Sequence, residues 1–195
     1  LLVEKEISPN VECWETNRIC DRRIFQKMGE QGFLGVSFPE AYGGSGMDMW
    51  SAVVITEELA YANVGGLSLS LYAHSYLALP AINALGTDEQ KQQYLVPAIK
   101  GEKIAALGIT ESGAGSDVAG ISTRAEDKGD HFIVNGSKMF ITNGTMADVI
   151  ILAVRTGENH NLSLLLFDTK TPGFSAIAVH NKLGMHTSDT AQLFF

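Results

Sequence analysis

Hydrophobic positions recur with two different periods along the chain, and the period changes near residue 103. Before that point apolar residues return every three or four positions, the spacing of one helix face. After it, apolar and polar residues alternate in short runs, the spacing of strands. We therefore predict an α+β multidomain chain, with an all-α helical domain over residues 1–104 and a β-strand domain over residues 105–195.

The helical part divides into segments marked by start and stop signals. We predict helices over residues 11–28, 49–62, 67–85 and 87–97. The third is almost uncharged, so we expect it to be buried on most sides. Thr87 with Gln90 three positions later is typical of a capping box, and Pro97 is expected to end that helix.

The second half reads as a series of short strands. They are expected at residues 103–110, 122–126, 131–135, 137–142, 149–155, 163–168, 175–179 and 191–195. Asn135-Gly136 between two of these runs predicts a hairpin, because both residues tolerate positive φ. Helices followed by strands argue against a Rossmann domain and favour a β-barrel or β-sandwich. Phe194 and Phe195 lie inside a strand pattern without a polar cap, so we expect a fragment.

Charge and cysteine content indicate which partners and which cellular compartment fit this protein. The net charge of −8 argues against a surface for nucleic acids or anionic membranes. Cys13 and Cys20 stand seven apart in the first predicted helix, too far apart for a disulfide, so we expect free thiols and a reducing compartment. The first residues lack a signal peptide's apolar core, and the longest apolar runs are too short to span a membrane.

Two segments carry candidate chemistry. From Leu107 to Asp117 the chain reads LGITESGAGSD, in which small residues after a strand can bring backbone N–H groups close to an anion. The same letters can form a plain tight loop, and no helical pattern follows to make a dinucleotide fingerprint. From Asn135 to Gly144 the chain reads NGSKMFITNG, which on its own fits an ordinary hairpin strand equally well.

Together these two segments resemble the acyl-CoA dehydrogenase family. Four further runs are similar to that family's motifs: PEAYGGSG from Pro39, EELA from Glu57, GTDEQK from Gly86, and LGM from Leu183 followed by Asp189-Thr190. The likeness covers nearly the whole chain. The Phe140 position and the run after Asp189 look weakly nearer to the long-chain enzymes.

The resemblance implies that FAD is the cofactor and assigns roles to individual positions. The flavin site would be formed by Leu107, Gly108, Ile109, Thr110, Gly115, Ser116, Phe140, Ile141 and Thr142. Thr110 would bond the isoalloxazine, Ser116 would reach the flavin pyrophosphate and the acyl-CoA, and the Thr142 hydroxyl would face N5. Donors there stabilise the negative charge that grows as a flavin accepts hydride.

This chain departs from the family pattern at two positions and lacks the expected base. Ser112 replaces a proline, which loosens the loop, and Phe140 replaces a tryptophan, which keeps an aromatic wall but loses an N–H. The family's catalytic glutamate lies in a C-terminal helical domain, expected beyond Phe195, so no catalytic residue is assigned here. Glu111, Glu57 and Glu58 are interpreted as structural. The five histidines, His160 among them, lack metal-ligand spacing.

Two hypotheses remain at this stage. In the first, the chain is part of an FAD-dependent enzyme that converts fatty acyl-CoA to trans-2-enoyl-CoA and passes electrons to an electron-transfer flavoprotein. Such an enzyme would be a homo-oligomer in the bacterial cytoplasm or the mitochondrial matrix. The second is a catalytically inactive flavin- or acyl-CoA-binding module or folding unit. A longer gene product bearing a catalytic glutamate would distinguish them.

Overall fold

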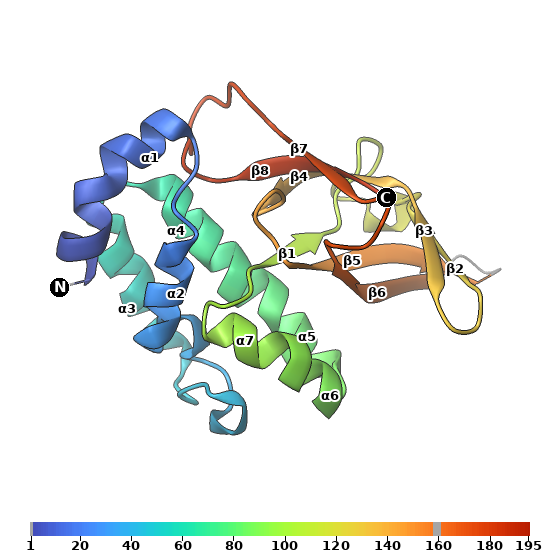
Figure 1. Cartoon of the computed structure of the whole chain (residues 1–195), viewed down its shortest axis with the longest axis horizontal. Helices are drawn as coiled ribbons and strands as arrows, with labels where there is room; N and C mark the ends of the chain where they lie inside the picture. Colours follow the sequence, from blue (N-terminus) through green and yellow to red (C-terminus); the bar gives the residue numbers. More distant parts are fainter. Residues whose placement is uncertain (1, 158–160) are drawn as a thin grey trace.

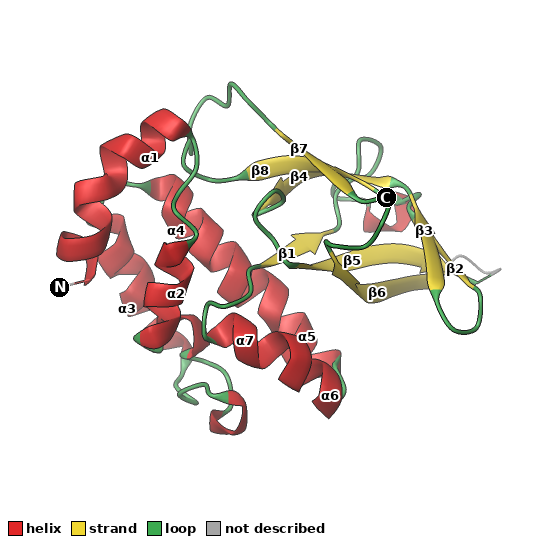
Figure 2. Cartoon of the chain, in the orientation of Figure 1, coloured by secondary structure: helices red, strands yellow, loops and turns green. Residues whose placement is uncertain are grey.

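A computed structural model describes residues 2–157 and 161–195 of the chain. Helices form the first half and strands the second, in the order predicted from the change of period (Figures 1 and 2). The helical stretch over residues 65–85 passes beneath the first strand, and the two sheets lie beside the helices (Figure 1).

The helical part consists of short helices joined by tight turns. Its α-helices are α1 (Val11–Asn17), α2 (Arg23–Glu30), α3 (Met49–Ala60), α4 (Gly65–Tyr72), α5 (Leu79–Leu85), α6 (Asp88–Gln90) and α7 (Val96–Ile99). Wider π turns are η1 (Val3–Ile7), η5 (Ala73–Ala78) and η6 (Lys91–Leu95), and 3-10 turns are η2 (Ser8–Asn10), η3 (Phe33–Gly35) and η4 (Glu40–Tyr42).

The strand part contains two sheets. The strands are β1 (Ala105–Gly108), β2 (Arg124–Asp127), β3 (Phe132–Asn135), β4 (Ser137–Thr142), β5 (Val149–Thr156), β6 (Asn161–Asp168), β7 (Ser175–Ala178) and β8 (Thr190–Phe194), with a 3-10 turn η7 (Val118–Gly120) before β2. One sheet has the order β1-β5-β2-β3, with β6 on the other edge of β5, and the second has the order β4-β8-β7. Strand pairing in the described residues does not close a barrel, so the sandwich alternative is the better description.

Three large hydrophobic clusters hold these layers together, and a small fourth one is formed by Ala114, Ile121 and Ala153. One lies within the helices around Phe25, a second joins α5 and α7 to β1 and β5, and a third lies between the two sheets around Ile150 and Leu193. The first six residues of β5 are all buried, which explains their unbroken apolar sequence.

His74 fastens the helices to the first strand. Its ring is fully buried on η5, Nδ1 accepts a hydrogen bond from the Ala105 N–H at 3.0 Å, and Nε2 lies 3.1 Å from the Ala98 carbonyl oxygen. Because Nδ1 is the acceptor, the proton of the neutral ring lies on Nε2 and is donated to Ala98. One side chain therefore links the middle of a helix, the end of α7 and the start of β1.

The predicted helix over residues 11–28 is wrong in its middle. It is two helices, because Arg18 has φ +60° and ends α1. Cys20 therefore lies in the connection to α2, buried, and does not share a helix face with the exposed Cys13. Both are free thiols, as predicted, and burial raises the pKa of the Cys20 thiol to about 12.

Thr87 and Gln90 form the predicted capping box, with both reciprocal hydrogen bonds present. Pro97 does not end the helix, which continues to Ile99. The helical stretch runs without a break from α6 through the π turn η6 into α7, and the proline lies in the first turn of α7.

The prediction of a hairpin at Asn135-Gly136 is also wrong. β3 pairs with β2 across a turn at Gly129, whereas β4 pairs with β8 in the other sheet. Gly136 is the corner between the sheets, with φ +153°, and a Cβ there would lie 2.7 Å from Thr123 Cα. Glycine is required here, but the reason is the close approach of Thr123, just before β2, and not a two-residue turn.

Candidate functional site

The loop after β1 is tied down at several points. The Thr110 carbonyl oxygen accepts a hydrogen bond from Met139 N–H of β4 at 2.8 Å. Glu111 and Ala114 exchange backbone hydrogen bonds of 2.9 and 3.2 Å, which closes a tight turn over Ser112 and Gly113. A Cβ added at Gly113 or Gly115 would meet nothing within 4 Å, so their faces are open. The loop therefore presents bare backbone next to β4.

β4 carries an irregularity directly beside this loop. Its register against β8 shifts between Lys138 and Ile141, so that Met139 and Phe140 oppose a single residue. Phe140 has φ +59°, rare for an aromatic residue, and the residue is 63% exposed. A strained, exposed aromatic residue in a strand is a functional candidate, because the fold gains no burial from it.

A buried ion pair joins the two segments. Lys138 Nζ of β4 lies 2.8 Å from Glu111 Oε1 and donates to the Ile109 carbonyl oxygen at 2.9 Å. The other oxygen, Oε2, accepts from the Ser122 N–H and hydroxyl, both at 2.7 Å, and Oε1 also accepts from Thr123 N–H at 3.0 Å.

These contacts determine the protonation of the pair. Burial alone would raise the pKa of the Glu111 carboxyl, but Lys138 and the other donors outweigh it and lower the pKa to about 2. Burial lowers the pKa of the Lys138 ammonium, and the Glu111 carboxylate opposes that shift. The pair is therefore an ammonium and a carboxylate, and Glu111 is committed to hydrogen bonds within the protein.

The residues predicted for the flavin site divide into two groups. Phe140 points to solvent and Thr142 is half-buried on the same outward side of β4, while Ile141 between them is buried in the core between the sheets. Leu107 and Ile109 pack their side chains into hydrophobic clusters, and a Cβ on Gly108 would lie 3.0 Å from Ile150. These inward-facing positions offer backbone only.

Three hydroxyl groups in this region are free to bind a ligand. Ser116 lies on the exposed part of the loop, and Thr110 and Thr142 are partly exposed. The hydroxyls of Thr110, Ser116 and Thr142 make no hydrogen bond to any other described residue. An exposed phenyl ring, open backbone and three free hydroxyls suit a flat aromatic ligand with polar edges and a negatively charged tail.

The far end of β4 is fixed to the helices by groups whose role the sequence did not reveal. Asn143, with φ +64° and fully buried, donates from Nδ2 to the Ser70 carbonyl oxygen at 2.9 Å. Its backbone N–H donates to the Asp189 carbonyl oxygen at 2.7 Å, and the Asp189 carboxylate accepts from the N–H groups of Thr145 and Met146. The motif position was visible in the sequence, but its partners lie 46 to 73 positions away.

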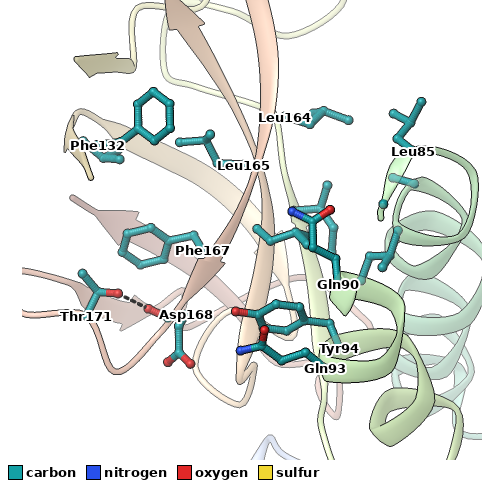
Figure 3. A pocket seen from close by; sticks show the side chains of 16 residues that line it. Leu85, Gln90, Gln93, Tyr94, Phe132, Leu164, Leu165, Phe167, Asp168 and Thr171 are labelled. Carbon is teal, nitrogen blue, oxygen red and sulfur yellow. Dashed lines mark hydrogen bonds between the residues drawn. The ribbon is translucent and has the colours of Figure 1, made fainter. Parts of the chain in front are cut away.

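A separate cleft of about 520 Å³ lies between the helices and the edge strand β6. Gln90, Gln93 and Tyr94 line one side, and Leu165 and Phe167 line the other (Figure 3). None of the residues predicted for the flavin site lines it.

Within residues 2–157 and 161–195, no three His, Cys, Asp or Glu side chains gather closely enough to hold a metal ion. His160 lies outside the described residues. In the same part of the chain, no helix has both the length and the apolar character needed to cross a membrane.

Comparison with known proteins gives a consistent result. Residues 2–102 match the sequence model described as "Acyl-CoA dehydrogenase, N-terminal domain", and residues 106–195 match "Acyl-CoA dehydrogenase, middle domain". The chain is 38% identical over 197 residues to the mitochondrial long-chain specific acyl-CoA dehydrogenase of Sus scrofa, covering 98% of this chain and 45% of that protein. It is 41% identical to the short-chain specific acyl-CoA dehydrogenase of Clostridium acetobutylicum, with 98% and 51% covered.

A solved structure agrees in fold. The acyl-CoA dehydrogenase from Bacillus anthracis, complexed with FAD, superposes with a TM-score of 0.90 at 33% identity, over 99% of this chain and 33% of that chain. The chain spans about half the length of the curated relatives it matches. A long-chain and a short-chain enzyme match it about equally, so this similarity does not select an acyl length.

Proposed function

Because the chain belongs to the acyl-CoA dehydrogenase family, we propose that the gene product containing it is an FAD-dependent enzyme. Its reaction removes two hydrogens from adjacent carbons of a fatty acyl-CoA thioester and yields the trans-2-enoyl-CoA. The observation that carries the proposal is the exposed, strained Phe140 beside the open loop after β1.

The residues present fit the cofactor. Phe140 offers an aromatic surface to one face of an isoalloxazine ring, and Gly113 and Gly115 leave room for close approach to backbone. The unpartnered hydroxyls of Thr110 and Thr142 would bond the polar edge of the ring. Ser116, exposed on the loop, would bond the pyrophosphate and the acyl-CoA.

Bound FAD supplies the hydride acceptor. The part of this chain is to hold the ring and to stabilise negative charge on it. Donation from Thr142 toward N5 and from Thr110 toward the pyrimidine side would do this in a site shielded from water by Phe140. Ser116 would restrain the acyl-CoA, so that the carbon losing hydride is held in one orientation.

The proposed partners follow from the same reaction. The substrate is an acyl-CoA, and electrons leave to an electron-transfer flavoprotein. The active form is a homo-oligomer. The relatives include mitochondrial and bacterial enzymes, which supports the mitochondrial matrix or the bacterial cytoplasm as the location.

A second candidate concerns the 195-residue chain taken alone, as a flavin- or acyl-CoA-binding module without turnover. One observation favours it: Glu111, which directly follows the proposed site residue Thr110, is buried and bonded to Lys138, Ser122 and Thr123. A carboxylate held in this way is not free to abstract a substrate proton.

The test is spectroscopic. The full gene product should purify with a flavin absorbance band that bleaches when a fatty acyl-CoA is added without oxygen and returns with an artificial electron acceptor. Testing butyryl-, octanoyl- and palmitoyl-CoA in parallel would determine the preferred acyl length. A colourless protein that binds a nicotinamide cofactor tightly, or a flavin that no acyl-CoA reduces, would refute the proposal.

A further inference from the structure

The ion pair between Glu111 and Lys138 is the most deeply buried charged contact among the described residues. The Lys138 side chain is 0% exposed and the Glu111 side chain 6%, whereas the Lys128–Glu126 pair is 39% and 65% exposed. A buried pair adds little net stability, because desolvation opposes the attraction, and apolar residues of equal size often serve as well. The pair therefore calls for an explanation other than stability.

Its geometry fixes Thr110 from both sides. Lys138 Nζ binds the carbonyl oxygen of the residue before Thr110 and the carboxylate of the residue after it. The Thr110 carbonyl oxygen is held in turn by Met139 N–H. Three consecutive loop residues are thus attached to two consecutive residues of β4, and the next residue on β4 is the strained Phe140.

The same carboxylate closes the exposed loop. Glu111 bonds Ala114 through its backbone at the start of the loop, and through its side chain it accepts from Ser122 and Thr123 where the loop leads into β2. Ser116 lies between these attachments. An apolar pair of equal volume could fill the space, but it could not hold three segments in a fixed register.

We propose that Glu111 and Lys138 are positioning residues for the flavin, setting the spacing between Thr110 and Phe140 and fixing both ends of the loop that carries Ser116. This inference rests on the proposed function. Neither residue need touch the cofactor. A pair that only fills the core could be exchanged for neutral side chains without changing the flavin, whereas a positioning pair could not.

The experiment separates folding from flavin binding in the FAD-loaded gene product. Lys138→Met and Glu111→Gln each leave one buried charge unpaired and should lower Tm strongly. The double variant Lys138→Met/Glu111→Gln removes both charges and keeps the acceptor for the two Ser122 donors, although the amide NH2 then faces Thr123 N–H, so Tm should recover in part. We nevertheless expect its Kd for FAD to rise about tenfold or more, equal to about 1.4 kcal/mol, with a shifted flavin absorbance.

The exposed pair provides a matched control. Lys128→Met/Glu126→Gln makes the same chemical changes at a surface pair and should alter neither the Kd for FAD nor the spectrum. A double variant at Glu111 and Lys138 with wild-type Kd and spectrum would overturn the inference. If the wild type itself binds no FAD, the proposed function fails instead.

A milder variant keeps the inference testable if the double variant does not fold. Ser122→Ala removes only the hydroxyl that donates to Glu111 Oε2, from an exposed residue, and should leave Tm nearly unchanged. We expect it to raise the Kd for FAD about two- to tenfold, the effect of one hydrogen bond. An unchanged Kd in a folded Ser122→Ala protein would also overturn the inference.

Discussion

Lowering the pH from 7 to 5 should destabilise this protein through one residue, His74. The ring is fully buried, and burial lowers its pKa from 6.5 to about 4, against the smaller opposing effects of the Ala98 hydrogen bond and Asp148. Both ring nitrogens are engaged, and Nδ1 faces the Ala105 N–H. A second proton on the ring would face that N–H and break the link to β1.

The size of the loss in folding stability follows from proton linkage. Between pH 6.5 and 4 the unfolded chain binds a proton that the folded chain does not, so stability is complete above pH 6.5 and is lost as the pH falls toward 4. With these two pKa values the loss between pH 7 and pH 5 is about 2 kcal/mol, and the whole shift corresponds to about 3 kcal/mol. A loss of this size is a large fraction of the stability of an ordinary domain.

The assay is urea unfolding of the gene product at pH 7, 6 and 5, with wild type compared to His74→Gln. Glutamine offers one donor and one acceptor but gains no proton in this range, so its unfolding free energy should be lower at pH 7 and fall less steeply toward pH 5. His131→Gln, which makes the same substitution at an exposed histidine, is the control. Parallel slopes for wild type and His74→Gln would show that His74 does not govern the acid sensitivity.

Three further predictions concern the site and the fold. Thr142→Val should slow flavin reduction about ten- to hundredfold in stopped-flow with little change in acyl-CoA binding, because a charge-stabilising hydrogen bond worth roughly 1.5–3 kcal/mol is lost, while Thr142→Ser should keep most of the rate. Gly136→Ala should cost about 1–3 kcal/mol in urea unfolding, because the new Cβ meets Thr123 at φ +153°, whereas Gly184→Ala, which has open space, should be nearly neutral. The 195-residue chain alone, given FAD and an acyl-CoA, should turn over at least about a hundredfold more slowly than an intact relative, and comparable turnover would show that a base lies within it.

Local sequence signals predicted the elements of this fold well. The change of period near residue 103 separates helices ending at Ile99 from strands beginning at Ala105. The capping box at Thr87 is formed by neighbouring residues, so its signal is complete within a few positions. The predicted domain boundary between residues 104 and 105 lies where the chain passes from α7 to β1. That the two parts are separate domains stays a prediction.

The errors at Gly136 and at Arg18 have a common physical origin, which is packing against distant residues. Gly136 is required by Thr123, the residue before β2, and a two-residue window cannot distinguish that demand from a hairpin turn. Arg18 adopts φ +60° although the apolar spacing continues past it, and its guanidinium donates to Asn181 from the distant connection between β7 and β8. That connection reaches across to α1, where Thr187 also donates to Glu15 (Figure 1).

The candidate site was predictable only in part, because its two segments are local motifs while their contacts join distant residues. Its two segments were found from their letters, and the structure brings Thr110 next to Met139. Which side chains face outward depends on the bulge at Phe140, and a strand pattern with strict alternation does not reveal a bulge. The pairing of Glu111 with Lys138, 27 positions later, depends on the fold and not on local sequence, although each residue stands in a motif.

The environment of Glu111 bears on where a catalytic base can be sought. A general base must reach the substrate proton and have a pKa near the working pH. Glu111 meets neither condition, because its pKa is lowered to about 2 and both oxygens already accept hydrogen bonds from Lys138, Ser122 and Thr123. Freeing the carboxylate would also release the loop that carries Ser116 and leave the Lys138 ammonium buried without its partner. A proton-abstracting role would therefore dismantle the arrangement that holds Thr110 beside Phe140, so the base of the proposed reaction must be a different residue.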